Sequence, residues 1–449
     1  MIYAFLKLIV KIALYIFFRK ISINNKKHIP KGGPLIIVSN HPNTFMDPVL
    51  IASILRQQVY FLAKSTVFGS PIKDWVLGKI FNMIPVYRKQ DLPPGKSGNN
   101  QAVFEKCFDF LENKGTLLIF PEGTSVMEKK LREIKSGTAR IALGAENQNQ
   151  FKLGVKILVV GINYSEGEKF RSDVTLNIDE AIHIDEWENK YKVSNTDAIK
   201  DLTELIREKL ENQLVITKDK DHERLLAQTE MIFKHELAET IDLPKKEKDF
   251  LISKGISDAL KYFEEKNSSL LLSLQQRLNA YFHKLDLLGL QDGLLKKKNL
   301  ETDIFKKSIG ISIFLLIGLP IWLFGLITNY LPYVIPSKIA SSFFKSIEYR
   351  APVMMASGIL TFSFYYLLAN ILIFQLTENW IFILVYTVLA ALSGFFVLFY
   401  WNVVLETKNN LKLLSIFRKE KEIIQELIEE RKEIYFMLKK AKEQYLNTL

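Results

Sequence analysis

The chain has 449 residues, and its 60 lysine and arginine side chains against 49 acidic ones give a net charge of +11. Apolar residues make up 48% of it, which supplies ample material for a core and excludes an intrinsically disordered chain. The single cysteine, Cys107, excludes an intramolecular disulfide framework and a cysteine-based zinc site. No recognised nucleic-acid-binding motif accompanies the positive charge, so we expect no nucleic-acid partner.

Residues 1–20 (MIYAFLKLIVKIALYIFFRK) are apolar apart from a few basic side chains. Lys7 and Lys11 lie four positions apart and therefore share one face of a helix. This pattern favours a helix that lies in the membrane interface with its lysines at the headgroups. A membrane span is the alternative, because lysines near helix ends can extend to the interface.

Between about residues 21 and 216, short apolar runs alternate with helical patterns such as residues 100–113. Alternation of this kind is typical of an α/β fold, with a largely parallel or mixed sheet flanked by helices. The segment 91–100, rich in proline, glycine and asparagine, is predicted to be a loop. We expect buried strands at residues 35–39, 59–63, 116–120 and 155–164.

A histidine and an aspartate follow the first of these strands, where the strand gives way to a turn and a helix. His41 comes just after the strand ends at Ser39, and Asp47 comes six positions after the histidine. A carboxylate that returns from a helix can hold one ring nitrogen of a histidine and leave the other as a general base. For this pair taken alone, a structural histidine with an unrelated aspartate is the alternative.

Polar residues also follow the strand at 116–120, and the carboxyl ends of strands are where α/β folds bind ligands. Further along, a lysine precedes a glycine that begins a helical pattern, and backbone amides at a helix start form an anion site together with such a cation. Another cation ends the short run IPVYR. The resulting candidate binding residues are Glu122, Gly123, Thr124, Lys135, Ser136, Gly137 and Arg88.

The second half of the chain changes in character. Residues 217–307 carry apolar side chains at three- and four-residue spacing among dense charge, which predicts amphipathic helices. Residues 406–449 are predicted to form a charged helical tail. Residues 308–405 contain three uncharged windows, each longer than the roughly 20 apolar residues that span a bilayer. The sequence therefore predicts an integral membrane protein.

The first uncharged window, residues 308–337, contains several residues that break a continuous helix. Gly318 and Pro320 lie near its centre, and Pro332 and Pro336 lie towards its end. We therefore predict a re-entrant or interfacial hairpin that returns to the cytoplasmic side, followed by two full spans, which keeps the basic flanks inside. Three full spans are the alternative, because the backbone of a hairpin must find partners within the protein.

Four motifs in order give the chain a resemblance to the glycerophospholipid acyltransferases. Members of that family carry an Asn-His block with a following Asp, a strand that ends in Arg, Phe-Pro-Glu-Gly-Thr, and a Val-Pro-like strand. The matching segments here are SNHPNTFMDP (39–48), IPVYR (84–88), FPEGTS (120–125) and VVGINY (159–164). Order and spacing agree over roughly residues 20–215.

Two features depart from the general pattern of that family. Most members place the aspartate one residue closer to the histidine, whereas Asp47 follows His41 by six positions. The longer spacing resembles a subgroup of eukaryotic-type glycerol-3-phosphate and dihydroxyacetone-phosphate acyltransferases, as do FPEGTS, KSG and the run KFRSDVTLN at 169–177. The last block normally has proline where this chain has Gly161, which leaves the alignment of that block less firm.

The resemblance implies roles for the candidate catalytic residues. His41 would take the proton from a glycerol hydroxyl as that hydroxyl attacks an acyl thioester. Asp47 would orient the imidazole and stabilise the imidazolium that forms, as in a triad whose nucleophile is the substrate itself.

The resemblance also implies roles for the binding residues. Glu122 and Gly123 would shape the glycerol pocket, and Arg88 and Lys135 would hold the phosphate through charge-assisted hydrogen bonds. Arg171 is a further candidate for phosphate binding, with an ordinary surface arginine as the alternative.

The implied function is a membrane-bound acyltransferase of phospholipid biosynthesis, with acyl-CoA or an acyl carrier protein thioester as donor. The acceptor would be the sn-1 hydroxyl of glycerol 3-phosphate or of dihydroxyacetone phosphate. Alternatives are acylation of 1-acylglycerol 3-phosphate to phosphatidate, and a non-catalytic lipid-binding scaffold. We expect no metal and no other cofactor, because a thioester is already activated. Since donor and acceptor are cytosolic metabolites, the catalytic domain is expected to face the cytoplasm.

Overall fold

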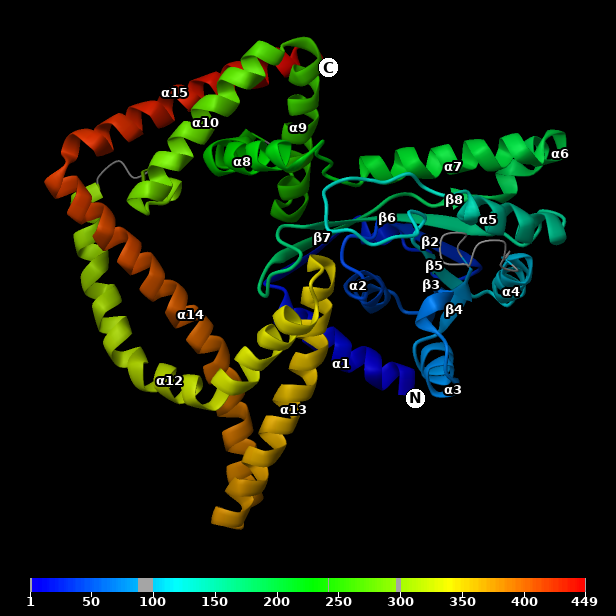
Figure 1. Cartoon of the computed structure of the whole chain (residues 1–449), viewed down its shortest axis with the longest axis horizontal. Coiled ribbons are helices and arrows are strands. Elements are labelled where there is room, and N and C mark those ends of the chain that lie inside the picture. The colour runs from blue at the N-terminus through cyan, green and yellow to red at the C-terminus, as the bar shows by residue number, and fades with distance from the viewer. Residues whose placement is uncertain (1, 88–99, 241, 296–299, 449) are drawn as a thin grey trace. The chain divides into compact units, whose positions relative to one another are not determined.

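The computed structural model, drawn in Figure 1, describes residues 2–87, 100–240, 242–295 and 300–448. The chain divides into two compact units. The first consists of Met1–Ile216 and Ala340–Met355, and the second of Thr217–Ile339 and Ala356–Leu449. All of residues 308–405 are predicted to form one membrane domain, so the membership of residues 340–355 in the first unit is not predicted.

A mixed β-sheet forms the centre of the first unit, as the alternating apolar runs predict. Over the described residues the sheet has eight strands in the order β1-β7-β6-β2-β5-β3-β4, with β8 paired to β6. The run from β6 to β4 is parallel, and β6 pairs antiparallel with β7 and β8. The strands are β1 (Lys20–Asn24), β2 (Leu35–Ser39), β3 (Val59–Lys64), β4 (Met83–Val86), β5 (Thr116–Ile119), β6 (Lys156–Tyr164), β7 (Asp173–Ile178) and β8 (Ile182–His183).

The four strands predicted from apolar runs are confirmed as β2, β3, β5 and β6. Strand β2 is buried at every position, because both faces of the sheet are covered. Leu35 and Ile37 belong to one core cluster, whereas Ile36 and Val38 belong to the other. The two-residue period of a strand thus divides one apolar run between two cores.

Helices cover both faces of the sheet and give the unit three layers. Figure 1 shows α1 and α2 on one side of the sheet and α5 and α7 on the other, in agreement with the two core clusters. The helix predicted at residues 100–113 is confirmed as α4. The helices of this unit are α1 (Ile2–Phe17), α2 (Met46–Ile54), α3 (Pro71–Trp75), α4 (Asn100–Glu112), α5 (Gly137–Gln148), α6 (Glu188–Val193) and α7 (Asn195–Asn212).

Helix α1 packs on the sheet and contributes side chains to the core of the first unit. Leu14 and Phe17 are buried in the core beside α2. Lys7 donates a hydrogen bond from Nζ to the Leu55 carbonyl at 2.6 Å, so it contacts the protein, and its place at the headgroups stays a prediction. The helix nevertheless exposes large apolar side chains, which suit a membrane interface. They are Phe5, Leu8, Ile12, Tyr15 and Ile16.

The chain after Ile216 is helical, as its amphipathic and apolar patterns predict. Helices α8, α9, α10 and α15 bury one apolar face each, with Leu225, Leu274 and Leu427 among the buried side chains. The helices are α8 (Lys220–Thr240), α9 (Lys245–Lys266), α10 (Ser268–Leu288), α11 (Asp292–Leu295), α12 (Leu300–Phe343), α13 (Arg350–Thr377), α14 (Trp380–Lys419) and α15 (Lys421–Leu446).

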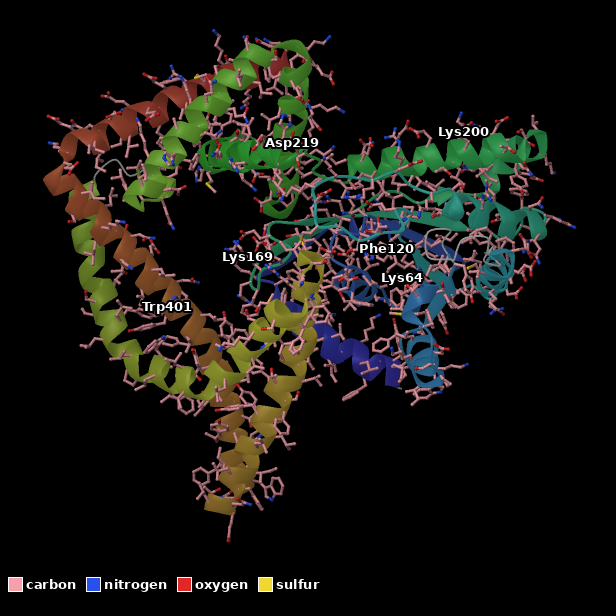
Figure 2. All side chains as sticks on the ribbon, viewed as in Figure 1. Lys64, Phe120, Lys169, Lys200, Asp219 and Trp401 are labelled. Carbon is pink, nitrogen blue, oxygen red and sulfur yellow. The ribbon has the colours of Figure 1, made fainter. Side chains whose placement is uncertain are left out.

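Three helices in the described part of the chain are long and apolar enough to cross a membrane. They cover Gly310–Phe343, Ile347–Thr377 and Trp380–Leu413, which correspond to the three uncharged windows. Trp380 and Trp401 are exposed on α14, and Figure 2 shows Trp401 on that helix. Aromatic side chains at the ends of an apolar stretch are typical of membrane interfaces.

Helix α12 is continuous where we expect its prolines to break it, and whether it returns to one side of the membrane as a hairpin stays a prediction. It runs as one helix from Leu300 to Phe343 with Pro320, Pro332 and Pro336 inside it, so the expectation that these residues end the helix is wrong. Each proline removes one backbone hydrogen bond, and a long helix can absorb that loss by bending. Figure 1 shows such a bend in the ribbon of α12.

Candidate active site

The site lies at the carboxyl edge of the sheet, where β2 and β5 end side by side. These strands are parallel neighbours, with Val38 beside Ile119, so the segments that follow them leave the sheet at the same edge. His41 follows β2 and Glu122 follows β5, and the His41 backbone N–H donates a hydrogen bond to Glu122 Oε1 at 3.0 Å. The structure therefore brings the two predicted motifs together.

His41 and Asp47 form the predicted pair. His41 Nδ1 lies 2.9 Å from Asp47 Oδ2. The Asp47 side chain, in the first turn of α2, is 0% exposed, whereas 19% of the His41 side chain remains accessible. An ionised carboxylate can only accept a hydrogen bond, so the proton of a neutral His41 ring lies on Nδ1 and leaves Nε2 its lone pair. The pair thus has the geometry of a general base that a buried carboxylate holds in one tautomer.

Two further donors hold the Asp47 carboxylate. The Asn43 backbone N–H donates to Oδ2 at 2.7 Å, and the Tyr164 hydroxyl donates to Oδ1 at 2.7 Å. Burial and the nearby charge of Asp47 raise the pKa of Tyr164 well above its usual value, so this hydroxyl stays a donor. Sequence reasoning missed Tyr164, although its place at the end of β6, a parallel neighbour of β2, is a signal that could have found it.

Phe120 and Glu122 fix the position of the histidine. The His41 ring stacks on Phe120, with ring centroids 3.9 Å apart and planes inclined by 12°; Figure 2 labels Phe120 within the α/β unit. Glu122 Oε2 accepts a hydrogen bond from the Arg132 backbone N–H at 3.2 Å, so both carboxylate oxygens bind backbone amides. Burial raises the pKa of Glu122, and these hydrogen bonds partly offset the rise. Glu122 braces the loop that carries His41, and its predicted contact with glycerol stays a prediction.

Lys135 lies against Gly123. An anion site that combines residues of FPEGTS (120–125) and KSG (135–137) requires this proximity. A Cβ atom at Gly123 would lie 2.8 Å from Lys135 Nζ, and the φ of Gly123 is +69°, a conformation that favours glycine. Ser136 stands at the N-cap position of α5, and Gly137 begins that helix. The lysine and the amides at the start of α5 are therefore close to the segment that follows β5.

Asn40 and Gly161 explain how the first and last motifs meet. Asn40 Nδ2 donates to the Ile162 carbonyl at 2.9 Å, and Asn40 Oδ1 accepts from the Ile162 N–H at 2.8 Å, which ties the end of β2 to β6. A Cβ atom at Gly161 would lie 2.4 Å from the Gln213 carbonyl oxygen, so no side chain fits there. Packing against Gln213 thus accounts for glycine at this position.

The remaining predicted residues have different outcomes. Arg88 lies outside the described residues. Arg171 donates from Nη1 to two carbonyl oxygens at the end of α1, at 3.3 and 3.5 Å, so its guanidinium caps that helix. Thr124 is half-buried in the segment after β5. Burial raises the pKa of Cys107 to about 12, which makes this thiol unreactive.

Chemically, this arrangement is suited to removing a proton from a hydroxyl or an amine. One ring nitrogen of His41 is occupied by a buried carboxylate, and the ring is partly accessible. A cation and the amides at a helix start lie near the same edge of the sheet and suit an anionic group on the substrate.

Comparisons with known proteins agree with this chemistry. Residues 20–165 match the family model described as Acyltransferase. The chain is 24% identical over 391 residues to glycerol-3-phosphate O-acyltransferase 1 of Saccharomyces cerevisiae, which covers 68% of this chain and 50% of that protein. It is 28% identical over 233 residues to glycerol-3-phosphate O-acyltransferase 2 of the same yeast, which covers 49% of this chain and 30% of that protein. The matched parts of these relatives are thus half of their length or less.

A bacterial relative matches slightly less than half of the chain. The 1-acyl-sn-glycerol-3-phosphate acyltransferase of Borreliella burgdorferi is 27% identical over 208 residues, which covers 46% of this chain and 76% of that protein. The crystal structure of the 1-acyl-sn-glycerophosphate acyltransferase from Thermotoga maritima aligns with 46% of this chain and 78% of that chain, at 22% identity and a TM-score of 0.34. The family match includes the loops that carry His41, Asp47 and Glu122.

Proposed function

Since residues 20–165 form an acyltransferase domain of the glycerophospholipid acyltransferase family, we propose that this chain acylates glycerol 3-phosphate or dihydroxyacetone phosphate. The acyl group would pass from an acyl thioester to the sn-1 hydroxyl. Two yeast relatives are named as glycerol-3-phosphate O-acyltransferases, and the longer spacing between His41 and Asp47 resembles that subgroup. The reaction would be an acylation step of phospholipid synthesis.

The observation that carries the proposal is the His41–Asp47 pair at the carboxyl edge of the sheet. The carboxylate is fully buried and accepts hydrogen bonds from His41, Asn43 and Tyr164. Three dedicated donors around one buried carboxylate favour a pre-organised base rather than a histidine that is present for packing alone. A non-catalytic scaffold would have no use for this arrangement.

The proposed step moves one proton and one acyl group. His41 Nε2 takes the proton of the acceptor hydroxyl as that oxygen attacks the thioester carbonyl carbon, and a C–O bond forms. Asp47 stabilises the resulting imidazolium. The C–S bond then breaks, and His41 returns the proton to the leaving thiolate. The step needs no metal, because the thioester is already activated.

Recognition of the acceptor phosphate is assigned to the cations near the same edge. Lys135, which lies against Gly123, and the amides at the start of α5 offer hydrogen bonds to a phosphate. Arg88 is proposed as a second phosphate ligand on the family resemblance alone.

Acylation of 1-acylglycerol 3-phosphate is the second candidate reaction. The relative from Borreliella burgdorferi is named for that acceptor, and the match covers most of its length. The chemistry at His41 would be the same for both acceptors, so only the acceptor pocket separates the two reactions.

One assay tests the proposal and separates the two acceptors. The purified full-length chain is given palmitoyl-CoA with radiolabelled glycerol 3-phosphate or with labelled lysophosphatidate, and the labelled lipid products are separated. We expect lysophosphatidate to form from glycerol 3-phosphate. Turnover of labelled lysophosphatidate alone would replace the first reaction with the second, and turnover of neither would contradict both.

The proposal also places the first unit on the cytoplasmic side of a membrane, where both substrates occur. Residue 346 belongs to the same compact unit as His41, so the two must share one side. The test is a single cysteine, Ser346→Cys, in a Cys107→Ala background, with an impermeant thiol reagent. We expect labelling only after the cells are permeabilised, and labelling in intact cells would contradict the orientation.

A further inference from the structure

Thr44, in the loop between His41 and Asp47, has a backbone conformation that its residue type disfavours. Its φ is +33°, and a β-branched side chain rarely adopts a positive φ. Such strained residues persist only where their surroundings hold them, and they gather at functional sites. What holds Thr44 therefore bears on the geometry of the catalytic loop.

Two hydrogen bonds hold Thr44 from different directions. Its backbone N–H donates to Ser125 Oγ at 2.8 Å, which links it to the segment after β5. Its hydroxyl donates to the Glu348 carbonyl at 2.9 Å, across 304 positions of sequence. Thr44 is 7% exposed, so water offers little replacement for either bond.

Glu348 belongs to the segment that joins two of the three apolar helices. We call residues 340–355, the last residues of α12 to the first residues of α13, the connector. Ala351 is fully buried in the same core cluster as Met46 and Leu50 of α2, and Pro352 is also buried. Figure 1 shows the start of α13 beside α1 and α2, which is consistent with this cluster. The connector thus contributes buried side chains to the core of the catalytic unit.

We propose that the connector positions the catalytic loop and that Thr44 is the positioning residue through which it acts. This inference rests on the proposed acyltransferase function and extends it: the membrane region supplies a part of the catalytic unit. The loop from His41 to Asp47 is short, and Asn43, the neighbour of Thr44, donates its N–H to Asp47. A shift of the turn at Thr44 therefore moves the carboxylate relative to the imidazole.

Two substitutions at Thr44 separate the hydroxyl from the shape of the side chain. Thr44→Val keeps the shape and removes the donor to Glu348, whereas Thr44→Ser keeps the donor. For Thr44→Val in the full-length protein, we expect kcat to fall about 10- to 100-fold, because a small displacement of reacting groups has this cost. The KM of each substrate is expected to stay within about twofold, and Thr44→Ser to restore most of kcat.

A matched control removes an equivalent hydroxyl outside the connector. Thr361, further along α13, donates its hydroxyl to the Pro332 carbonyl at 3.2 Å, and Thr361→Val is expected to leave kcat within about twofold. A second variant, Ala351→Leu, displaces the connector by enlarging one of its own fully buried side chains. If the connector acts through Thr44, Ala351→Leu lowers kcat in the wild-type background and has little further effect in Thr44→Val.

A second readout does not depend on turnover. Hydrogen exchange of the peptide that covers residues 41–47 is expected to quicken about tenfold in Thr44→Val and in Ala351→Leu, but not in Thr361→Val. Unchanged exchange and an unchanged kcat in Thr44→Val would overturn the proposal, as would additive effects of Thr44→Val and Ala351→Leu. If the wild-type protein transfers no acyl group, the acyltransferase proposal fails, and the exchange measurement still decides the role of the connector.

Discussion

Each of the two units contains a buried aspartate that accepts a hydrogen bond from a tyrosine hydroxyl, and the third residue of each cluster differs. In the first unit, Asp47 binds Tyr164 and His41. In the second, Asp292 accepts hydrogen bonds from the Tyr281 hydroxyl at 2.8 Å and from Arg431 Nε at 2.7 Å. Both carboxylates are almost completely buried, with side-chain exposures of 0% and 4%.

The difference shows that a buried Asp–Tyr pair is not by itself a functional site. Arginine has only donors and keeps its charge, so the cluster around Asp292 joins α10, α11 and α15 but offers no basic ring nitrogen. Histidine bound through Nδ1 leaves a basic nitrogen, and this one lies at a sheet edge and is partly accessible. Whether a histidine or an arginine binds the aspartate, and whether solvent reaches that residue, therefore separates the catalytic cluster from the structural one.

The largest effect on activity is expected from removal of the charge in the first cluster. Asp47→Asn keeps the shape of the side chain but not the negative charge that stabilises the imidazolium. We expect kcat to fall about 10²- to 10⁴-fold with little loss of folded protein. Steady-state kinetics of the purified variant measures this, and Asp292→Asn is the matched control, whose turnover per folded molecule should be normal.

In the second cluster, loss of the cation should affect stability alone. Arg431→Leu leaves the buried Asp292 without its counter-charge, which typically costs ~3–5 kcal/mol of unfolding free energy. Denaturant unfolding of the protein in detergent micelles measures the change. A variant that unfolds normally, or that has lost turnover per folded molecule, would remove the distinction between the two clusters.

The two tyrosines permit a like-for-like comparison. Each change to phenylalanine removes one hydrogen bond to a buried carboxylate, at a cost of ~1–3 kcal/mol. For Tyr281→Phe we expect only lower stability. For Tyr164→Phe we expect kcat to fall about tenfold as well, because Asp47 is then less firmly held beside His41. Equal kcat values for the two variants would show that Tyr164 has no part in positioning Asp47.

The smallest expected effect concerns Glu122 and pH. Burial raises the pKa of Glu122 above its ordinary value of 4.5. Its contribution to stability is therefore fully present below pH 4.5 and is lost as the pH rises through the raised pKa. Relative to Glu122→Gln, which does not titrate, the wild-type protein should lose stability over that rise in pH. Thermal unfolding at a series of pH values measures this, and a difference that stays constant with pH would contradict it.

Much of the first unit follows from local sequence signals. Apolar runs identify β2, β3, β5 and β6, and the polar residues directly after β2 and β5 identify the site, because parallel neighbours end at one edge. Strand β7 was not predicted, since Asp173–Ile178 alternates polar and apolar residues and lacks a continuous apolar run. Strand β1, which pairs with β7, also lacks a continuous apolar run and was not predicted for the same reason.

Other features depend on contacts that local sequence does not encode. Nothing near Glu348 indicates that its carbonyl meets Thr44, which is 304 positions away. The polar residues of the connector resemble an ordinary break between two apolar windows. The prolines of α12 are equally ambiguous, because a proline can either end a helix or bend it, and packing decides between these outcomes.

The most direct test of the account is acyl transfer by His41→Ala. The purified full-length variant and the wild-type protein are compared with radiolabelled glycerol 3-phosphate and palmitoyl-CoA, after circular dichroism and unfolding curves have shown equal folding. The account predicts wild-type turnover and a loss of about 10²- to 10⁴-fold in the variant, because the general base is gone while the packing of the core is kept. Near-normal turnover by a folded His41→Ala variant would contradict it.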